Sequence, residues 1–218
     1  MSGVVVPQLV GFAGFALALA AAAVAITGRR GGGRWRFVGL LAAAVAWVPL
    51  GGIPLAGYLR GFFGDLSVTT MLLLVAALIG RVWGGRVLDG PERVALWGWS
   101  VAAGLALYPL TLGSTPWDPY QLGFRPRMLL LVVAALVIGL WRRRRGSALV
   151  LAAGVAGYDL HILESSNLWD YLVDPALTLW AMGALLARSP TGRRLGAIIR
   201  RALGGARLSP LPSGEKAR

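Results

Sequence analysis

The chain has 218 residues, of which 56% are hydrophobic and only 14% are charged, whereas charged residues make up about a quarter of a typical soluble domain. The formal net charge is +13, but the arginines stand in clusters between apolar stretches, which argues against a nucleic-acid partner. The chain has no cysteine and one histidine, which excludes disulfides, thiolate nucleophiles and most zinc or haem ligand sets. We therefore expect an integral membrane protein without a metal or a cofactor.

Seven apolar stretches predict an all-α domain of seven transmembrane helices over residues 1–190. A helix needs about 20 residues, at about 1.5 Å each, to cross a hydrocarbon core of about 30 Å. The first stretch is expected to stay in the mature protein, because residues 1–8 contain no basic residue of the kind that opens a signal peptide. The predicted helices cover residues 5–27, 37–58, 66–80, 94–112, 128–141, 148–162 and 171–187.

The charges of the connecting segments predict the orientation, because basic loops stay on the cytoplasmic side. Arginines follow the first, third, fifth and seventh predicted helices, whereas the other connections hold most of the acidic residues. The N-terminus is therefore expected outside and the C-terminus in the cytoplasm.

The composition indicates the source of the chain. Arginine far exceeds lysine and alanine is abundant, which is typical of GC-rich bacterial genomes. We expect a multi-pass protein of a bacterial inner (cytoplasmic) membrane.

Residues 191–218 are expected to form a basic cytoplasmic tail. Within residues 193–207, four apolar side chains share one helical face and arginines surround them: Leu195, Ile198, Ile199 and Leu203. Helices of this kind lie on anionic membrane surfaces, so we expect the segment to bind the anionic inner leaflet. Beyond residue 209, a solvated basic tail is an equal alternative.

The second predicted helix contains an interruption at residues 48–54, with two prolines and two glycines. These residues free backbone carbonyls that hydrocarbon does not satisfy. Two interpretations are open: a broken span beside a binding site, or a helix that ends early and is followed by an interfacial hairpin over residues 53–63. The outer connection 113–125 is rich in turn residues and aromatics, and we expect it to form a lid over a cavity.

Charged residues at membrane depth are costly and predict a functional site. Counting about 1.5 Å per residue from the inner arginines places Asp159, Asp174 and Arg127 at one level. We predict a buried cluster of these three residues in the outer third of the membrane. Asp65 stands at the start of the third predicted helix, where capping is its expected role. Further candidates for the same polar cavity are Asp170, His161, Glu164, Asp65, Asp118, Trp117 and Tyr120.

Three functions are compatible with these features. We favour a non-catalytic membrane subunit or accessory protein that packs against a larger membrane complex or another copy of itself, because the chain is short and contains no complete catalytic motif. The second is an outer-leaflet enzyme acting on a lipid-linked sugar or phosphate, with Asp159 or Asp174 as base and Arg127 holding an anionic group. The third is a carrier for a small solute or cation that uses the same carboxylates.

Overall fold

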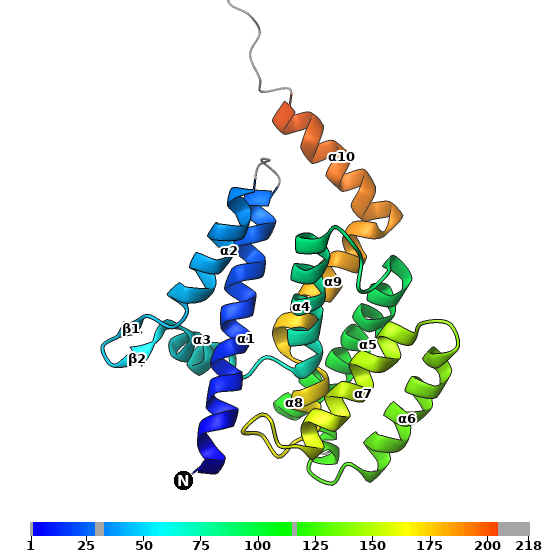
Figure 1. Ribbon diagram of the computed structural model, residues 1–218. Coiled ribbons are helices and arrows are strands. Elements are labelled where there is room, and N and C mark those ends of the chain that lie inside the picture. The colour runs from blue at the N-terminus through cyan, green and yellow to red at the C-terminus, as the bar shows by residue number, and fades with distance from the viewer. Residues whose placement is uncertain (1, 29–32, 115–116, 205–218) are drawn as a thin grey trace, which may run out of the picture.

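The structure is a computed structural model that describes residues 2–28, 33–114 and 117–204. It is all-α apart from one short hairpin, which confirms the all-α part of the predicted fold class (Figure 1). The helices and strands are α1 (Ser2–Thr27), α2 (Arg34–Val45), β1 (Pro49–Leu50), β2 (Ile53–Pro54), α3 (Leu55–Phe63), α4 (Val68–Trp83), α5 (Gly90–Pro109), η2 (Leu110–Ser114), η3 (Pro119–Gly123), α6 (Arg127–Trp141), α7 (Arg145–Asp159), α8 (Trp169–Leu172), α9 (Pro175–Arg188) and α10 (Pro190–Gly204).

Two of the described helices are long and apolar enough to cross a membrane by themselves. They cover Val5–Thr27, with 23 residues, and Gly90–Gly113, with 24 residues. The other predicted spans give shorter helices, from 12 residues in α2 to 16 residues in α4, or about 18 to 24 Å of helix. Seven full-length spans are therefore not confirmed. In α2, α4, α7 and α9, a capping residue or a turn starts or ends the helix inside the predicted apolar stretch, whereas α6 covers the whole of its predicted stretch, residues 128–141.

The interruption in the second predicted helix is a β-hairpin. α2 ends at Val45, Pro49 pairs with Pro54 and Leu50 with Ile53, and the two turn glycines have φ angles of +61° and +89°. Positive φ angles at both turn positions are the geometry that glycine permits in tight hairpins. The Ala46 carbonyl accepts a hydrogen bond from Ala56 N at 2.8 Å. Of the two interpretations, the structure has the early helix end, but the hairpin lies at residues 49–54, and the helix α3 occupies most of the 53–63 segment that was expected to form it.

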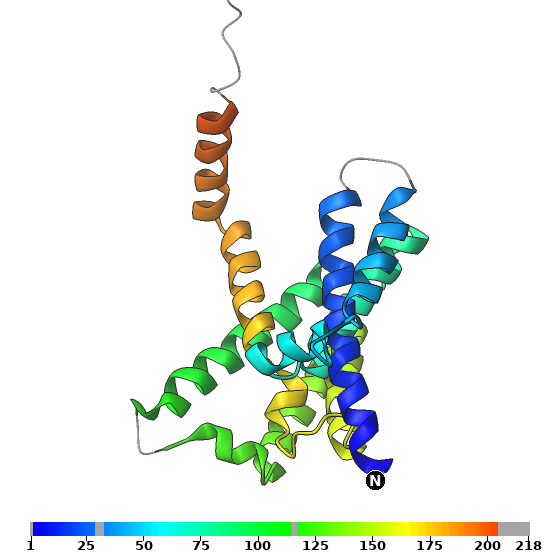
Figure 2. The same cartoon turned by 90° about the vertical axis from the view of Figure 1, so that its left-hand side faces the viewer.

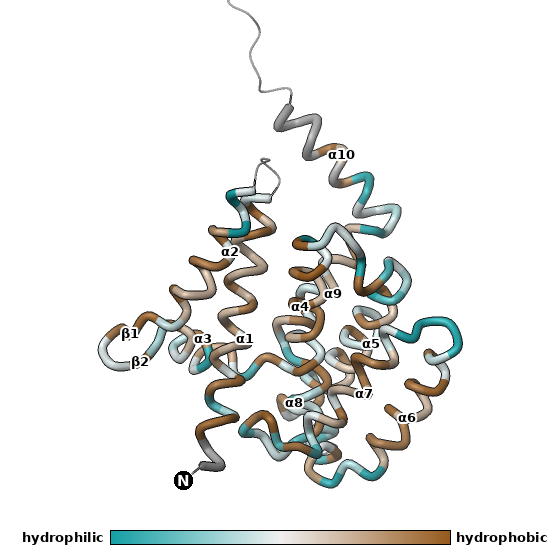
Figure 3. The backbone as a smooth tube through the Cα atoms, in the orientation of Figure 1, coloured by the Kyte–Doolittle hydropathy of each residue, from teal (hydrophilic) through white to brown (hydrophobic). Residues whose placement is uncertain are grey.

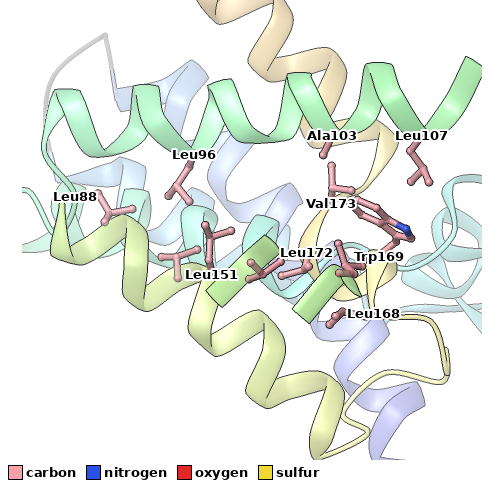
Figure 4. Packing of buried hydrophobic residues seen from close by; sticks show 12 residues of the cluster. Leu88, Leu96, Ala103, Leu107, Leu151, Leu168, Trp169, Leu172 and Val173 are labelled. Carbon is pink, nitrogen blue, oxygen red and sulfur yellow. The ribbon is translucent and has the colours of Figure 1, made fainter. Parts of the chain in front are cut away.

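The helices run between two ends of the bundle, which Figure 1 shows at the bottom and the top. We call them the N-terminal end, with the start of α1, the 64–67 linker and the 117–126 and 160–174 connections, and the arginine-rich end, with the 84–89 and 142–144 connections. α1 packs on α2, α3 and α4, α5 packs on α9, and α7 packs on α4, α5 and α6. The main core lies between α5, α7 and α8, where Leu96, Leu107, Leu151, Trp169 and Leu172 are buried (Figure 4).

The bundle buries polar side chains while many large apolar side chains face outward. Phe37, Leu131, Ile138 and Trp180 are between 67% and 75% exposed, and Figure 3 shows hydrophobic residues along the helices and hydrophilic ones in their connections. The described polar side chains that are buried are Ser67, Thr69, Thr70, Ser100, Ser147, Asn167, Asp174 and Thr178. A soluble bundle has few large exposed apolar patches, so this distribution is the one expected in lipid.

The predicted basic helix after residue 190 is present as α10 up to Gly204, and Figure 2 shows it projecting from the bundle beyond α9. The Ser189 hydroxyl accepts a hydrogen bond from Gly192 N at 3.0 Å, which satisfies a free amide at the helix start. Arg193, Arg194, Leu195 and Ile198 are exposed. Residues 205–218, the rest of the predicted tail, lie outside the described residues.

Candidate functional site

The Asp174 carboxylate connects the starts of two helices at the N-terminal end. Asp174 is 3% exposed and caps α9, where its Oδ1 accepts a hydrogen bond from Leu177 N at 2.8 Å. Its Oδ2 accepts hydrogen bonds from Ser67 N at 3.0 Å, from Ser67 Oγ at 2.7 Å and from Thr70 Oγ1. Ser67 is itself the cap of α4. The carboxylate therefore receives donors from the amino-terminal ends of both helices, where backbone dipoles favour negative charge.

An ion-pair network lies beside this connection, at the other end of the 64–67 linker. Arg60 binds Asp65 through two hydrogen bonds, Nε to Oδ1 at 2.5 Å and Nη2 to Oδ2 at 2.9 Å, and its Nη2 lies 2.7 Å from Glu164 Oε2. The hydrogen bonds that Arg60 donates to Asp65 and Glu164 raise the pKa of Arg60, while burial acts in the opposite direction. The pair is mostly buried, with side-chain exposures of 16% for Arg60 and 14% for Asp65. Asp65 was expected to cap the following helix, but Ser67 does so.

A groove of about 440 Å³ opens next to the Arg60–Asp65 pair, between α1 and α3. Phe12 and Ile53 contribute apolar side chains to its lining, which also includes Gly57, Gly61 and Gly64. The Arg60 guanidinium carbon lies 5.9 Å from the centre of the Phe12 ring. With Arg60 bound to two carboxylates, the network carries a net charge near −1.

The connection around η3 is bound tightly to the 165–170 segment. The Tyr120 hydroxyl donates to Asp170 Oδ2 at 2.9 Å, and Ser165 Oγ also donates to Oδ2. Trp169 Nε1 donates to the Pro119 carbonyl at 3.0 Å. Burial and the negative charge of Asp170 raise the pKa of Tyr120, which keeps its hydroxyl protonated as a donor. These bonds hold residues 119–120, which belong to the connection that was expected to form a lid, against the 165–170 segment.

Asp118 serves this connection rather than a cavity. Its Oδ1 accepts hydrogen bonds from Tyr120 N at 2.9 Å and from Thr111 Oγ1 at 3.2 Å. It is the cap of η3, which is a role that an aspartate before a proline and a short helix commonly takes. Trp117 is 58% exposed.

The predicted cluster of Arg127, Asp159 and Asp174 is not formed. Arg127 and Asp159 are exposed, and the ion pairs within the described ranges all involve Arg60. Residue counting gives the level of a side chain along a helix but leaves its direction around the helix undetermined, and each residue turns by about 100°. His161 is also exposed, with a positive φ of 51° and its Nδ1 3.0 Å from the Asp159 carbonyl.

Only four of the ten predicted candidates are brought together by the structure, as two separate pairs. Asp65 and Glu164 share Arg60, and Asp170 and Tyr120 bond to each other, while Asp174 binds residues that were not among the candidates. Arg60, Ser67 and Thr70 are the main omissions. A lone arginine five residues before an aspartate was a usable signal for the ion pair. No local signal links Ser67 to Asp174, because 107 residues separate them.

Within the described part of the chain, no group of three or more histidine or acidic side chains is placed to hold a metal ion. Comparison with protein-family models, with curated proteins and with solved structures finds no match for this chain. The site is therefore defined by its own geometry: an ion pair at a groove, and a buried carboxylate that accepts hydrogen bonds from two helix starts.

Replacing Arg60 with glutamine is expected to destabilise the fold by about 1–3 kcal/mol, because Asp65 keeps its mostly buried carboxylate but loses both ionic hydrogen bonds. Glu164→Gln, which alters the 41% exposed partner, should cost less than about 1 kcal/mol. Denaturant unfolding in mixed micelles measures both. A smaller loss in Arg60→Gln than in Glu164→Gln would contradict the assignment of Asp65 as the main partner.

Proposed function

We propose that this protein is a multi-pass membrane protein of a bacterial inner membrane, with the N-terminal end outside and the arginine-rich end in the cytoplasm. Its seven spans would be formed by α1, α2, α4, α5, α6, α7 and α9. Support comes from the outward-facing apolar side chains, such as Ile138 and Trp180, around a core that contains polar groups. Irregular backbone at membrane depth is tolerated where protein buries it, and Asn167, Leu168 and Trp169 before α9 are buried.

Within the membrane, we infer a non-catalytic role as a subunit or accessory protein that packs against a larger membrane complex. The observation that carries this proposal is the occupation of the acidic side chains. Asp174 accepts four hydrogen bonds from protein donors, Asp65 is held by Arg60, and Asp170 by Tyr120 and Ser165. A general base or an ion-binding carboxylate needs a free acceptor that faces its substrate, whereas these groups join elements of the fold.

The proposal is tested by purifying the tagged chain from its native membrane in a mild detergent. We expect a second membrane protein, or further copies of this chain, in fixed stoichiometry. Recovery of a single chain free of any protein partner would contradict the accessory role.

We also propose that α10 contacts the anionic inner leaflet. If it does, backbone amide exchange in α10 should be slower in anionic nanodiscs than in neutral ones, and equal rates would contradict this contact.

An outer-leaflet enzyme is a second candidate, and the groove beside Arg60 is the observation in its favour. Gly61 lines this groove, and a Cβ atom added there would meet nothing within 4 Å, so a tryptophan at this position has room to fill the groove. Under the accessory role, Gly61→Trp should keep complementation of a deletion strain at the wild-type level. Loss of complementation with normal protein abundance would favour the enzyme instead. Gly139→Trp, at an open position on α6 outside the groove, is the matched control.

A further inference from the structure

A second cavity, of about 340 Å³, lies at the arginine-rich end between the last turns of α4, the 84–89 connection and the first turn of α5. Its lining includes three arginines, Arg81, Arg86 and Arg93, and the apolar residues Leu73, Ala76 and Ala77 of α4. Its shape depends on a close backbone approach: a Cβ atom on Gly80 would lie 2.7 Å from the Gly85 carbonyl oxygen.

Among the residues that the structure describes, no carboxylate pairs with the three arginines at this cavity. No acidic residue lines the cavity, and none of the ion pairs in the described ranges includes these arginines. The two acids nearby in sequence have other roles at the start of α5: Asp89 Oδ1 accepts from Glu92 N at 2.6 Å, and Glu92 Oε2 from Asp89 N at 2.9 Å. Glu92 Oε1 also accepts from Gly146 N at 2.7 Å. The cavity therefore has a local excess of positive charge.

We propose that this cavity binds the phosphate group of an anionic phospholipid from the leaflet at the arginine-rich end. The arginines attract and bind the phosphate oxygens. From Arg81 back to Leu73 is eight residues, or about 12 Å along α4, so the apolar wall extends from headgroup depth to the depth of an acyl chain. Trp83, next to the cavity in sequence, is 75% exposed and suits the membrane interface. The apolar half of the lining favours a lipid over free phosphate.

This inference rests on the proposed membrane insertion but not on the accessory role. The wild-type chain, delipidated in neutral detergent, is titrated with phosphatidylglycerol and with phosphatidylcholine of the same chain length, and bound lipid is counted by native mass spectrometry. We expect one phosphatidylglycerol bound at least tenfold more tightly than phosphatidylcholine. Inorganic phosphate at the same concentrations should not displace it. Equal binding of the two lipids, or displacement by phosphate at equal concentration, would overturn the proposal.

Variants locate the binding. Each arginine near a membrane surface contributes about fivefold to anionic lipid affinity, so Arg81→Gln, Arg86→Gln and Arg93→Gln together should weaken phosphatidylglycerol binding by roughly a hundredfold. The single change Arg86→Gln, at an exposed residue, should weaken phosphatidylglycerol binding by about fivefold. It replaces the triple variant if that variant fails to fold. The matched control changes the exposed Arg142, Arg143 and Arg145 to glutamine and should retain the lipid. Equal losses in the control and the cavity variants would overturn the assignment.

Carbonate extraction of membranes that contain the wild-type chain separates this inference from the proposed function. Release of the wild-type chain into the soluble fraction would contradict membrane insertion, and with it both proposals. Retention of the chain in the membrane, combined with no preference for phosphatidylglycerol, would overturn the lipid site alone.

Discussion

Asp174→Ala is expected to lower the free energy of unfolding by about 3–5 kcal/mol. The change removes the acceptor for four hydrogen bonds, from Leu177 N, Ser67 N, Ser67 Oγ and Thr70 Oγ1, at a residue that is 3% exposed. Each buried donor left without a partner costs about 1–3 kcal/mol, and partial rearrangement reduces their sum. Denaturant unfolding of the purified chain in mixed micelles gives the measurement.

Two further variants make this prediction specific. Asp174→Asn should cost about 1–3 kcal/mol. Asparagine can still cap α9 through its side-chain oxygen, but its NH2 group would face the Ser67 N–H, and two donors cannot form a hydrogen bond with each other. Asp159→Ala removes an exposed carboxylate and should change stability by less than about 0.5 kcal/mol. A loss below about 1 kcal/mol in Asp174→Ala would show that the carboxylate does not hold the two helix starts together.

Gly123→Ala is expected to destabilise the chain by about 3–5 kcal/mol, through a steric clash and the loss of buried hydrogen bonds. A Cβ atom at this position would lie 1.7 Å from Asn167 Oδ1 and 2.8 Å from Trp169 Cδ1. Asn167 is fully buried, and its Oδ1 accepts a hydrogen bond from Trp169 N at 2.9 Å while its Nδ2 donates to the Tyr120 carbonyl at 3.0 Å. The side chain cannot yield without breaking these bonds.

The control for this prediction is Gly139→Ala on α6, where a Cβ atom meets open space. Alanine should be neutral or stabilise the helix by up to about 1 kcal/mol, because glycine is the poorer helix former. Unfolding in micelles, followed by circular dichroism, compares the two variants. Equal stability of both would contradict the close packing of the η3 connection against the 165–170 segment.

The sequence predicted the elements of the fold better than the contacts between them. Hydropathy identified the apolar stretches, and the prolines and glycines near residue 50 identified an interruption. The hydrogen bond from Ala56 N to the Ala46 carbonyl, which closes that interruption, depends on a turn geometry that composition does not specify. Helix ends also moved inward, because Asp174 and Ser67 act as caps inside stretches that hydropathy assigns to continuous spans.

The candidate site was predicted less well, for a geometric reason. Counting residues from the inner arginines ranks side chains by depth, and that ranking placed Asp159 beside Asp174. α7 ends at Asp159, which is exposed, whereas Asp174 caps the start of α9 and is buried. The depth of a side chain depends on one helix alone. Whether two side chains touch also depends on how each helix is oriented about its own axis and on the path of the 160–168 connection between them. The Arg60–Asp65 pair is local in sequence and was within reach of sequence reasoning.

The most direct test of the account is cysteine accessibility, because the natural chain contains no cysteine. Single substitutions would be made at three exposed residues: His161→Cys at the N-terminal end, Arg143→Cys at the arginine-rich end and Ile138→Cys on the apolar surface of α6. In intact spheroplasts, a membrane-impermeant maleimide should label position 161 alone, reach position 143 only after lysis, and reach position 138 only after denaturation. Rapid labelling of position 138 in the folded chain, or equal labelling of positions 143 and 161 before lysis, would contradict a bundle that spans the membrane with its apolar side chains in lipid.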